Sequence, residues 1–222
     1  MTHTCHRRGT PEGLLGDYVV LPRVDPAVPE QLHYSGPLPP RMRRLAGILT
    51  RHEPLALDVR IDGRQVTYRR SADTGASGDE LQHIAGNPRL TEVRHAVYDD
   101  RDPVEEVLRE VKEANLGISI VVSGLLDEVE RACRSVGLRP RAAHLSLGTW
   151  GRTDLLPDEP TLELCTMCGH GLVSAQLVAR LVDMVKAGDM TTEEAANELC
   201  RPCVCNVVNM ERANAILKEL CR

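Results

Sequence analysis

The sequence is almost devoid of aromatic residues. Among its 222 residues there is no phenylalanine, and aromatic side chains make up only 2% of the chain. Proteins that bind single-stranded nucleic acid commonly stack its bases on aromatic rings. That mode of binding is excluded in practice, and a folded core has to be built mainly from aliphatic side chains.

Neither an excess of positive charge nor a long hydrophobic run is present. The chain carries 27 basic and 32 acidic residues, mixed along its length, for a formal net charge of -5. No broad basic face is expected, so nucleic acid is not predicted as a partner. No apolar run reaches the roughly 18 residues of a membrane span, and residues 1–16 lack the apolar stretch of a secretory signal. These absences predict a soluble, cytoplasmic protein without a membrane partner.

What the chain does contain is eight cysteines. In a reducing compartment, cysteines serve more often as metal ligands or catalysts than in disulfides. A chain of this length buries enough surface to fold without a metal or a disulfide. Three segments are predicted: a proline-rich wrapping segment (1–56), an α/β domain (57–148) and a helical, cysteine-rich domain (149–222).

The first of these segments is dense in proline. Most of the chain's 14 prolines lie between residues 10 and 54, where they are expected to break any regular element longer than a few residues. Just beyond it, the turn pair Asp62-Gly63 separates two stretches of alternating polarity. This pattern predicts an antiparallel hairpin formed by residues 57–61 and 64–69.

Residues 94–148 alternate between strand and helix signals. Strands are expected at 95–98, 118–122 and 142–147, with helices between them that are capped by Asp102 and Ser123. Consecutive strand–helix–strand units imply right-handed crossovers between parallel strands. The predicted fold class is therefore α/β, with a small, mostly parallel sheet, an N-terminal β-hairpin and a C-terminal helical domain.

The C-terminal domain is predicted to consist of helices. An apolar stripe runs from residue 172 to 185 and ends at Gly188. Thr191 and Glu194 form a capping box for a second helix that reaches Cys200. Asn206 or Asn209 is expected to cap a third helix.

Five cysteines form two compact groups at the ends of this predicted helical hairpin. A spacer of two residues allows both sulfurs of a pair to reach one metal or one cluster. Because the hairpin returns the chain to its start, the two groups are expected to share one site. The predicted ligands are Cys165, Cys168, Cys203 and Cys205, with Cys200 as an alternative.

The metal predicted from the sequence is an iron–sulfur cluster, and a structural zinc ion is the alternative. Three cysteines within six residues, with Pro202 among them, favour an iron–sulfur cluster of the [4Fe-4S] type. Cys168-Gly169 resembles a zinc knuckle, which favours a structural zinc ion. The first alternative predicts a cluster-dependent enzyme or a cofactor-maturation or redox factor acting on a small molecule or a partner protein. The second predicts a structural or interaction module, and neither fixes an oligomeric state.

Several histidines and cysteines outside this ligand set have open roles. His170 is interpreted as a ligand, as a proton donor in catalysis, or as a polar cap of the following helix. His3, Cys5 and His6 have ligand-like spacing near the N-terminus. Cys133 and Cys221 lie outside the two cysteine groups and are expected to be buried and inert.

Met167-Cys168-Gly169-His170-Gly171 also resembles the motif that carries one catalytic cysteine in the proline racemase family. The resemblance implies a cofactor-independent isomerase in which the Cys168 thiol exchanges a proton at the α-carbon of the substrate. It covers five residues. The glycine-rich motif of the family's second cysteine is absent, since the residues from Pro202 to Cys205 contain no glycine.

Overall fold

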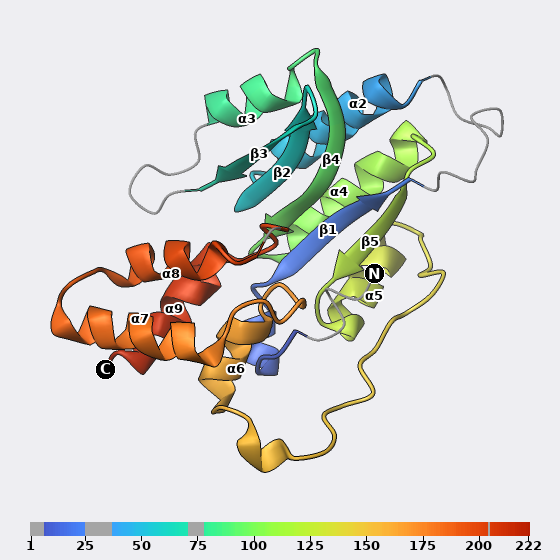
Figure 1. Cartoon of the computed structure of the whole chain (residues 1–222). Coiled ribbons are helices and arrows are strands. Elements are labelled where there is room, and N and C mark those ends of the chain that lie inside the picture. Colours follow the sequence, from blue (N-terminus) through green and yellow to red (C-terminus); the bar gives the residue numbers. More distant parts are fainter. Residues whose placement is uncertain (1–6, 25–36, 71–77, 204) are drawn as a thin grey trace. The chain divides into compact units, whose positions relative to one another are not determined.

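The computed structural model describes residues 7–24, 37–70, 78–203 and 205–222. The chain divides into two compact units (Figure 1). The first, Leu15–Arg141, is called the sheet unit below. The second consists of Met1–Leu14 together with Ala142–Arg222 and is called the cysteine unit. His3, Cys5 and His6 lie outside the described residues.

The sheet unit contains an antiparallel sheet with the strand order β3-β2-β4-β1-β5. Each pair of neighbouring strands runs antiparallel. The strands are β1 (Tyr18–Arg23), β2 (Ala56–Ile61), β3 (Arg64–Arg69), β4 (Leu90–Tyr98) and β5 (Ser119–Ser123). The α/β class is thus confirmed, whereas the prediction of a mostly parallel sheet is wrong.

The parallel sheet was expected because β4, a helix and β5 follow one another in the chain. In the structure β1 lies between these two strands and is antiparallel to both, so β4 and β5 never pair. The expected third strand of this series, residues 142–147, has no regular structure and is exposed. Because β1 comes from the proline-rich segment, local sequence signals gave no indication that it would occupy this place.

Prolines do not prevent regular structure in that segment. Pro22 lies in β1, beyond the residues of β1 that pair with β4. Leu38–Arg51 forms the 14-residue helix α2, whose prolines stand in its first turn. Backbone N–H groups in the first helical turn have no intrahelical partner, so a proline there costs no hydrogen bond.

The β2–β3 hairpin is confirmed. Ala56 pairs with Arg69 and Ile61 with Arg64, which leaves Asp62-Gly63 as a two-residue loop. Both loop residues have positive φ, 51° for Asp62 and 75° for Gly63. A type I′ turn requires this conformation, and its twist matches that of the paired strands.

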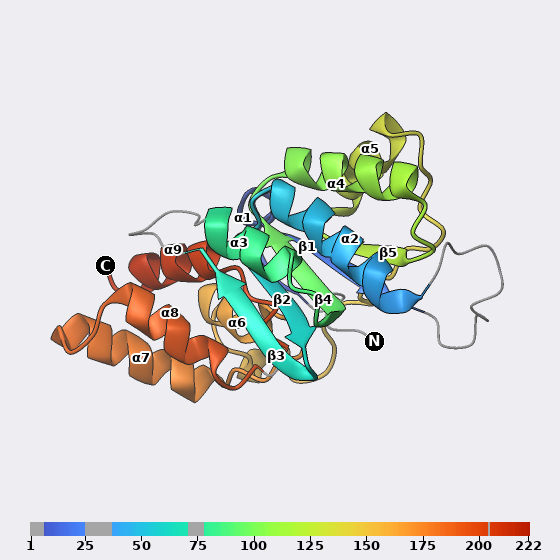
Figure 2. The ribbon, with the colours of Figure 1, turned by 90° about the horizontal axis from the view of Figure 1, so that it is seen from above.

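Within the described residues of the sheet unit, the helices beside the sheet are α2, α3 (Gly78–Ala85), α4 (Arg101–Ala114) and α5 (Leu126–Ser135). Helices α2 and α4 lie on the same side of the sheet (Figure 2). The N-cap of α4 is Asp100 and that of α5 is Leu125, so the predicted caps at Asp102 and Ser123 are wrong by two residues. Helix and strand side chains share one core of leucine, valine, isoleucine and tyrosine. Tyr18, Tyr68 and Tyr98 are fully buried in it and replace the missing phenylalanine.

The regular elements of the cysteine unit are helices. Its elements are α1 (Pro11–Leu14), the 3-10 helix η1 (Thr153–Leu155), α6 (Glu159–Thr166), α7 (Ala175–Ala187), α8 (Thr192–Cys200) and α9 (Met210–Leu220). Gly188 ends α7 in the left-handed conformation, and Thr191 with Glu194 forms the expected capping box. Asn209 caps α9 by accepting a hydrogen bond from the Arg212 backbone N–H.

The N-terminal segment is bound to this unit by two arginines. The Arg8 backbone N–H donates to Thr166 Oγ1 at 3.0 Å. The largely buried Arg212 guanidinium donates to the Arg8 carbonyl at 2.8 Å and to Glu163 Oε2 at 2.6 Å. Residues more than 200 positions apart in the sequence are therefore joined within one unit. Among the residues described, no helix is both long and apolar enough to cross a membrane.

Candidate metal centre

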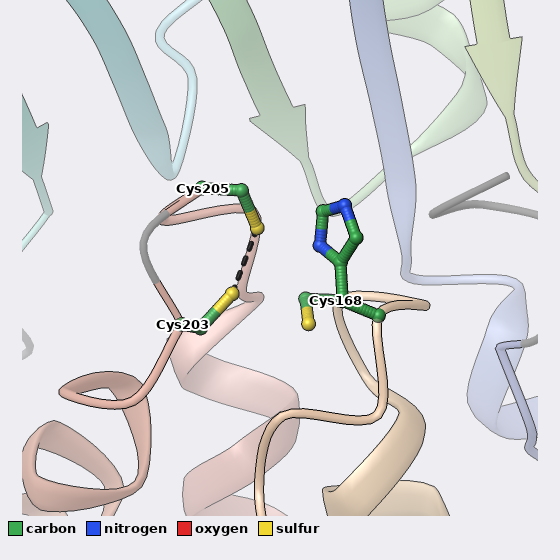
Figure 3. Close-up of side chains that lie close together, drawn as sticks. Cys168, Cys203 and Cys205 are labelled. Atoms are coloured by element: carbon green, nitrogen blue, oxygen red, sulfur yellow. Dashed lines mark hydrogen bonds between the residues drawn. The ribbon is translucent and has the colours of Figure 1, made fainter. Parts of the chain in front are cut away.

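Three thiols and one imidazole converge in the cysteine unit. The ligand atoms of Cys168, His170, Cys203 and Cys205 all lie within 4.8 Å of one another. Figure 3 shows that Cys203 and Cys205 belong to one loop and Cys168 to another. The first loop follows α6, and the second joins α8 to α9. One cysteine of the first group and two of the second thus lie close together, and with His170 they could hold a metal.

The first loop is shaped by a turn at the end of α6. The Gly169 backbone N–H donates to the Thr166 carbonyl at 2.7 Å. Gly169 and Gly171 have φ of 78° and 64°, a left-handed conformation that residues with a Cβ rarely adopt. His170 therefore stands between two glycine turns. Ser174 then caps α7 by accepting a hydrogen bond from the Leu177 backbone N–H.

The second loop contains two successive turns. The Cys203 N–H donates to the Cys200 carbonyl at 3.0 Å, and the Asn206 N–H donates to the Cys203 carbonyl at 3.2 Å. Asn206 adopts a left-handed conformation with φ of 56°. These turns bring the sulfurs of Cys203 and Cys205 to 2.7 Å from each other (Figure 3).

The three thiols are buried, whereas His170 is exposed. Cys168, Cys203 and Cys205 expose only 2%, 1% and 8% of their surface. A hydrogen bond from Cys203, then one from Cys205, lowers the pKa of the Cys168 thiol. The contact with Cys168 raises the pKa of both Cys203 and Cys205. One thiolate is thus stabilised by two neighbouring thiols, while ionising all three in a buried place requires a cation among them.

Apolar side chains surround Cys168. A cavity partly lined by Cys168 measures only about 10 Å³, which leaves room for no more than one water. Its lining consists of Leu164, Met167, Val173, Leu199, Val208 and Ala213 as well as Cys168. An apolar shell of this kind limits the access of solvent to a metal centre.

The structure does not bring all the predicted ligands together. Cys165 lies within α6, where burial raises the pKa of its thiol, and it is not part of the four-residue group. Cys200, the alternative ligand, ends α8 and donates to Met210 Sδ at 3.1 Å. Instead His170 joins Cys168, Cys203 and Cys205. The sequence feature that pointed to His170 was the pair of glycines, Gly169 and Gly171, on either side of it.

The remaining cysteines of the described part lie elsewhere. Cys133 is in α5 of the sheet unit, where burial raises the pKa of its thiol. Cys221 follows α9 and is half-buried. Neither belongs to the four-residue group.

Comparison with known proteins identifies no relative. No family model matches the sequence, and no match was found among curated proteins or solved structures. The likeness of Met167–Gly171 to the proline racemase motif is therefore confined to those five residues.

Proposed function

We propose that Cys168, His170, Cys203 and Cys205 bind one zinc ion that stabilises the cysteine unit as a structural or interaction module. The observation that carries this proposal is the spacing of the four ligand atoms, which all lie within 4.8 Å of one another. The sequence favoured an iron–sulfur cluster over zinc, whereas this spacing favours the single ion.

Bond lengths explain why the spacing favours one ion. Zn–S bonds of about 2.3 Å in a tetrahedron place neighbouring sulfurs about 3.8 Å apart. In a four-iron cluster each thiolate binds its own iron, so iron–iron distances add to the separation of the sulfurs. Four ligands within 4.8 Å therefore suit a mononuclear centre better than a cluster.

The donor set also suits zinc. Three cysteines and one histidine are a standard structural zinc set, and soft thiolates exclude magnesium and calcium. A divalent ion supplies the positive charge that three buried thiolates require. Four protein ligands close the coordination sphere, which is typical of structural rather than catalytic zinc.

The proposed ion would join two loops that are far apart in the sequence. Cys168 and His170 follow α6, whereas Cys203 and Cys205 precede α9. Binding free energy at such a site contributes directly to folding, and in zinc-finger peptides it amounts to roughly 10–16 kcal/mol. The ion would thus fasten the open end of the α7–α8 hairpin.

Metal and acid-labile sulfide analysis of protein purified without oxygen tests this proposal. We expect about one zinc per chain and no sulfide. Cys168→Ser, Cys203→Ser and Cys205→Ser should each lower the zinc content, while the matched control Cys133→Ser in the sheet unit should keep it. Iron with stoichiometric sulfide would contradict the zinc proposal and show that the site binds an iron–sulfur cluster.

Two further variants decide the fourth ligand. Cys165→Ser should retain zinc, because Cys165 is outside the four-residue group, whereas His170→Ala should bind it more weakly. The reverse result would restore the four-cysteine set that the spacing of the sequence suggests.

A further inference from the structure

We propose that this centre is sensitive to oxidation: a hydroperoxide converts Cys203 and Cys205 into a disulfide, and the zinc ion is released. The inference rests on the proposed function, since it requires a bound ion. Oxidation would then regulate whether the ion is bound, which goes beyond a purely structural role for zinc.

The first observation is the closeness of the two thiols. Their sulfurs are 2.7 Å apart, a contact that Figure 3 marks with a dashed line, and one residue separates them in the chain. Zinc itself has no redox chemistry, so electrons taken from the centre have to come from thiolate sulfur. Around a zinc ion the two sulfurs would lie about 3.8 Å apart, and the loop also allows them to approach to 2.7 Å. Little movement of the chain is therefore needed for a bond to form between them.

The second observation is the unequal exposure of the ligands. His170 is exposed, while the three sulfurs are buried. The left-handed glycines on both sides of His170 let the backbone turn there, and a Cβ at Gly171 would meet no atom within 4 Å. His170 is therefore the ligand that leaves with the least disturbance, and its departure opens a path to the sulfurs.

The reaction needs only the hydroperoxide and two protons, which the solvent supplies. The thiolates of Cys203 and Cys205 lose two electrons, their two zinc–sulfur bonds break and one sulfur–sulfur bond forms. The hydroperoxide takes up these electrons and two protons, its oxygen–oxygen bond breaks, and water and an alcohol, or two waters, result. Cys168 and His170 remain as two ligands, which is too few for a stable structural site. A thiol reductant reverses the change by disulfide exchange.

The inference is tested by adding hydrogen peroxide to the zinc-loaded full chain. Released zinc is followed with a chromogenic chelator, and the cysteine pairing is determined by peptide mass spectrometry. We expect zinc release in step with a Cys203–Cys205 disulfide, and recovery of zinc binding after dithiothreitol and added zinc. Zinc that stays bound while peroxide is consumed, or release with both thiols still reduced, would overturn the inference.

Variants separate this mechanism from general oxidative damage. His170→Gln, loaded with zinc, should release the ion about tenfold faster under peroxide, because the exposed ligand no longer protects the sulfurs. Cys133→Ser and Cys221→Ser should release zinc at the rate of the unchanged chain. An unchanged rate in His170→Gln would show that peroxide does not enter at His170. The zinc content before peroxide is added reports separately on the proposed function.

Discussion

The sheet unit and the cysteine unit bury different kinds of side chain. In the sheet unit, four helices and five strands share a cluster of aliphatic residues and tyrosines. The sheet unit buries one cysteine, Cys133, whereas five of the described cysteines of the cysteine unit are buried. Helices α6 to α9 have 8 to 13 residues and those of the sheet unit have 8 to 14, so the helices of both units depend on tertiary contacts. Short helices gain little stability by themselves. The comparison suggests that one unit folds by aliphatic burial alone and that the other also depends on a metal.

Removal of the metal should give the largest difference between the units. Chelation should speed amide hydrogen exchange in α6 to α9 by about 100-fold, because the ion joins the loops at their ends. Exchange in β1 to β5 should not change, since the sheet needs no metal. Hydrogen exchange measured by mass spectrometry on loaded and stripped protein provides the test. Equal protection in both states would mean that the cysteines hold no structural ion, and loss of protection everywhere would mean that the units unfold together.

A core substitution in the sheet unit should give the opposite pattern. Leu57 in β2 is fully buried in the aliphatic cluster. Leu57→Ala should lower the free energy of unfolding of this unit by about 2–5 kcal/mol, because it leaves a cavity. Zinc content should stay unchanged. Urea denaturation with parallel metal analysis tests both statements, and a loss of zinc in this variant would contradict the independence of the two units.

A smaller effect is expected where the N-terminal segment joins the cysteine unit. Arg212→Ala removes hydrogen bonds to the Arg8 carbonyl and to Glu163, at the cost of about 2–3 kcal/mol. Limited proteolysis should then cut before Leu14 at protease levels that leave the unchanged chain intact. The matched control is Arg201→Ala, since Arg201 forms only an exposed ion pair with Glu198 in the same unit. Equal cleavage of both variants would show that Arg212 does not hold the segment.

The smallest predicted loss of stability comes from breaking an ion pair at the surface of the sheet unit. A hydrogen bond from Arg51, and then one from His52, lowers the pKa of Glu110 below its usual value of 4.5. A depressed carboxyl pKa contributes stability above the unfolded-state pKa, and this stability is lost as pH falls through the native pKa. Glu110→Gln should cost only about 0.5–1 kcal/mol at pH 7. The difference should vanish in denaturation curves measured well below pH 4.5, and a difference that persists there would contradict the ionic origin.

The sequence predicted those features that depend on neighbouring residues. The Asp62-Gly63 hairpin and the Thr191 capping box follow from local turn and cap signals, and the approach of Cys168 to Cys203 follows from the helical hairpin between them. The place of β1 did not, because pairing between residues far apart in the sequence leaves no local pattern. This one strand separates β4 from β5 and makes the sheet antiparallel.

The candidate site shows the same limit. The spacing of Cys165 and Cys168 suggested that both point to the metal, as in a turn. In the structure α6 extends through Cys165 to Thr166, and the turn comes later, at Gly169. His170 follows that turn and joins the group in place of Cys165. Where a helix ends thus decides which residues meet, and that boundary is difficult to predict from sequence.

X-ray absorption at the zinc edge of the loaded full chain tests the central claim most directly, because it counts the ligands and measures their distances. The predicted spectrum has three sulfur ligands at about 2.3 Å and one nitrogen ligand at about 2.0 Å. The His170→Ala variant should lose the nitrogen contribution and keep the three sulfurs. Four sulfurs around zinc, or an iron centre with iron neighbours in the purified protein, would contradict a single ion held by Cys168, His170, Cys203 and Cys205.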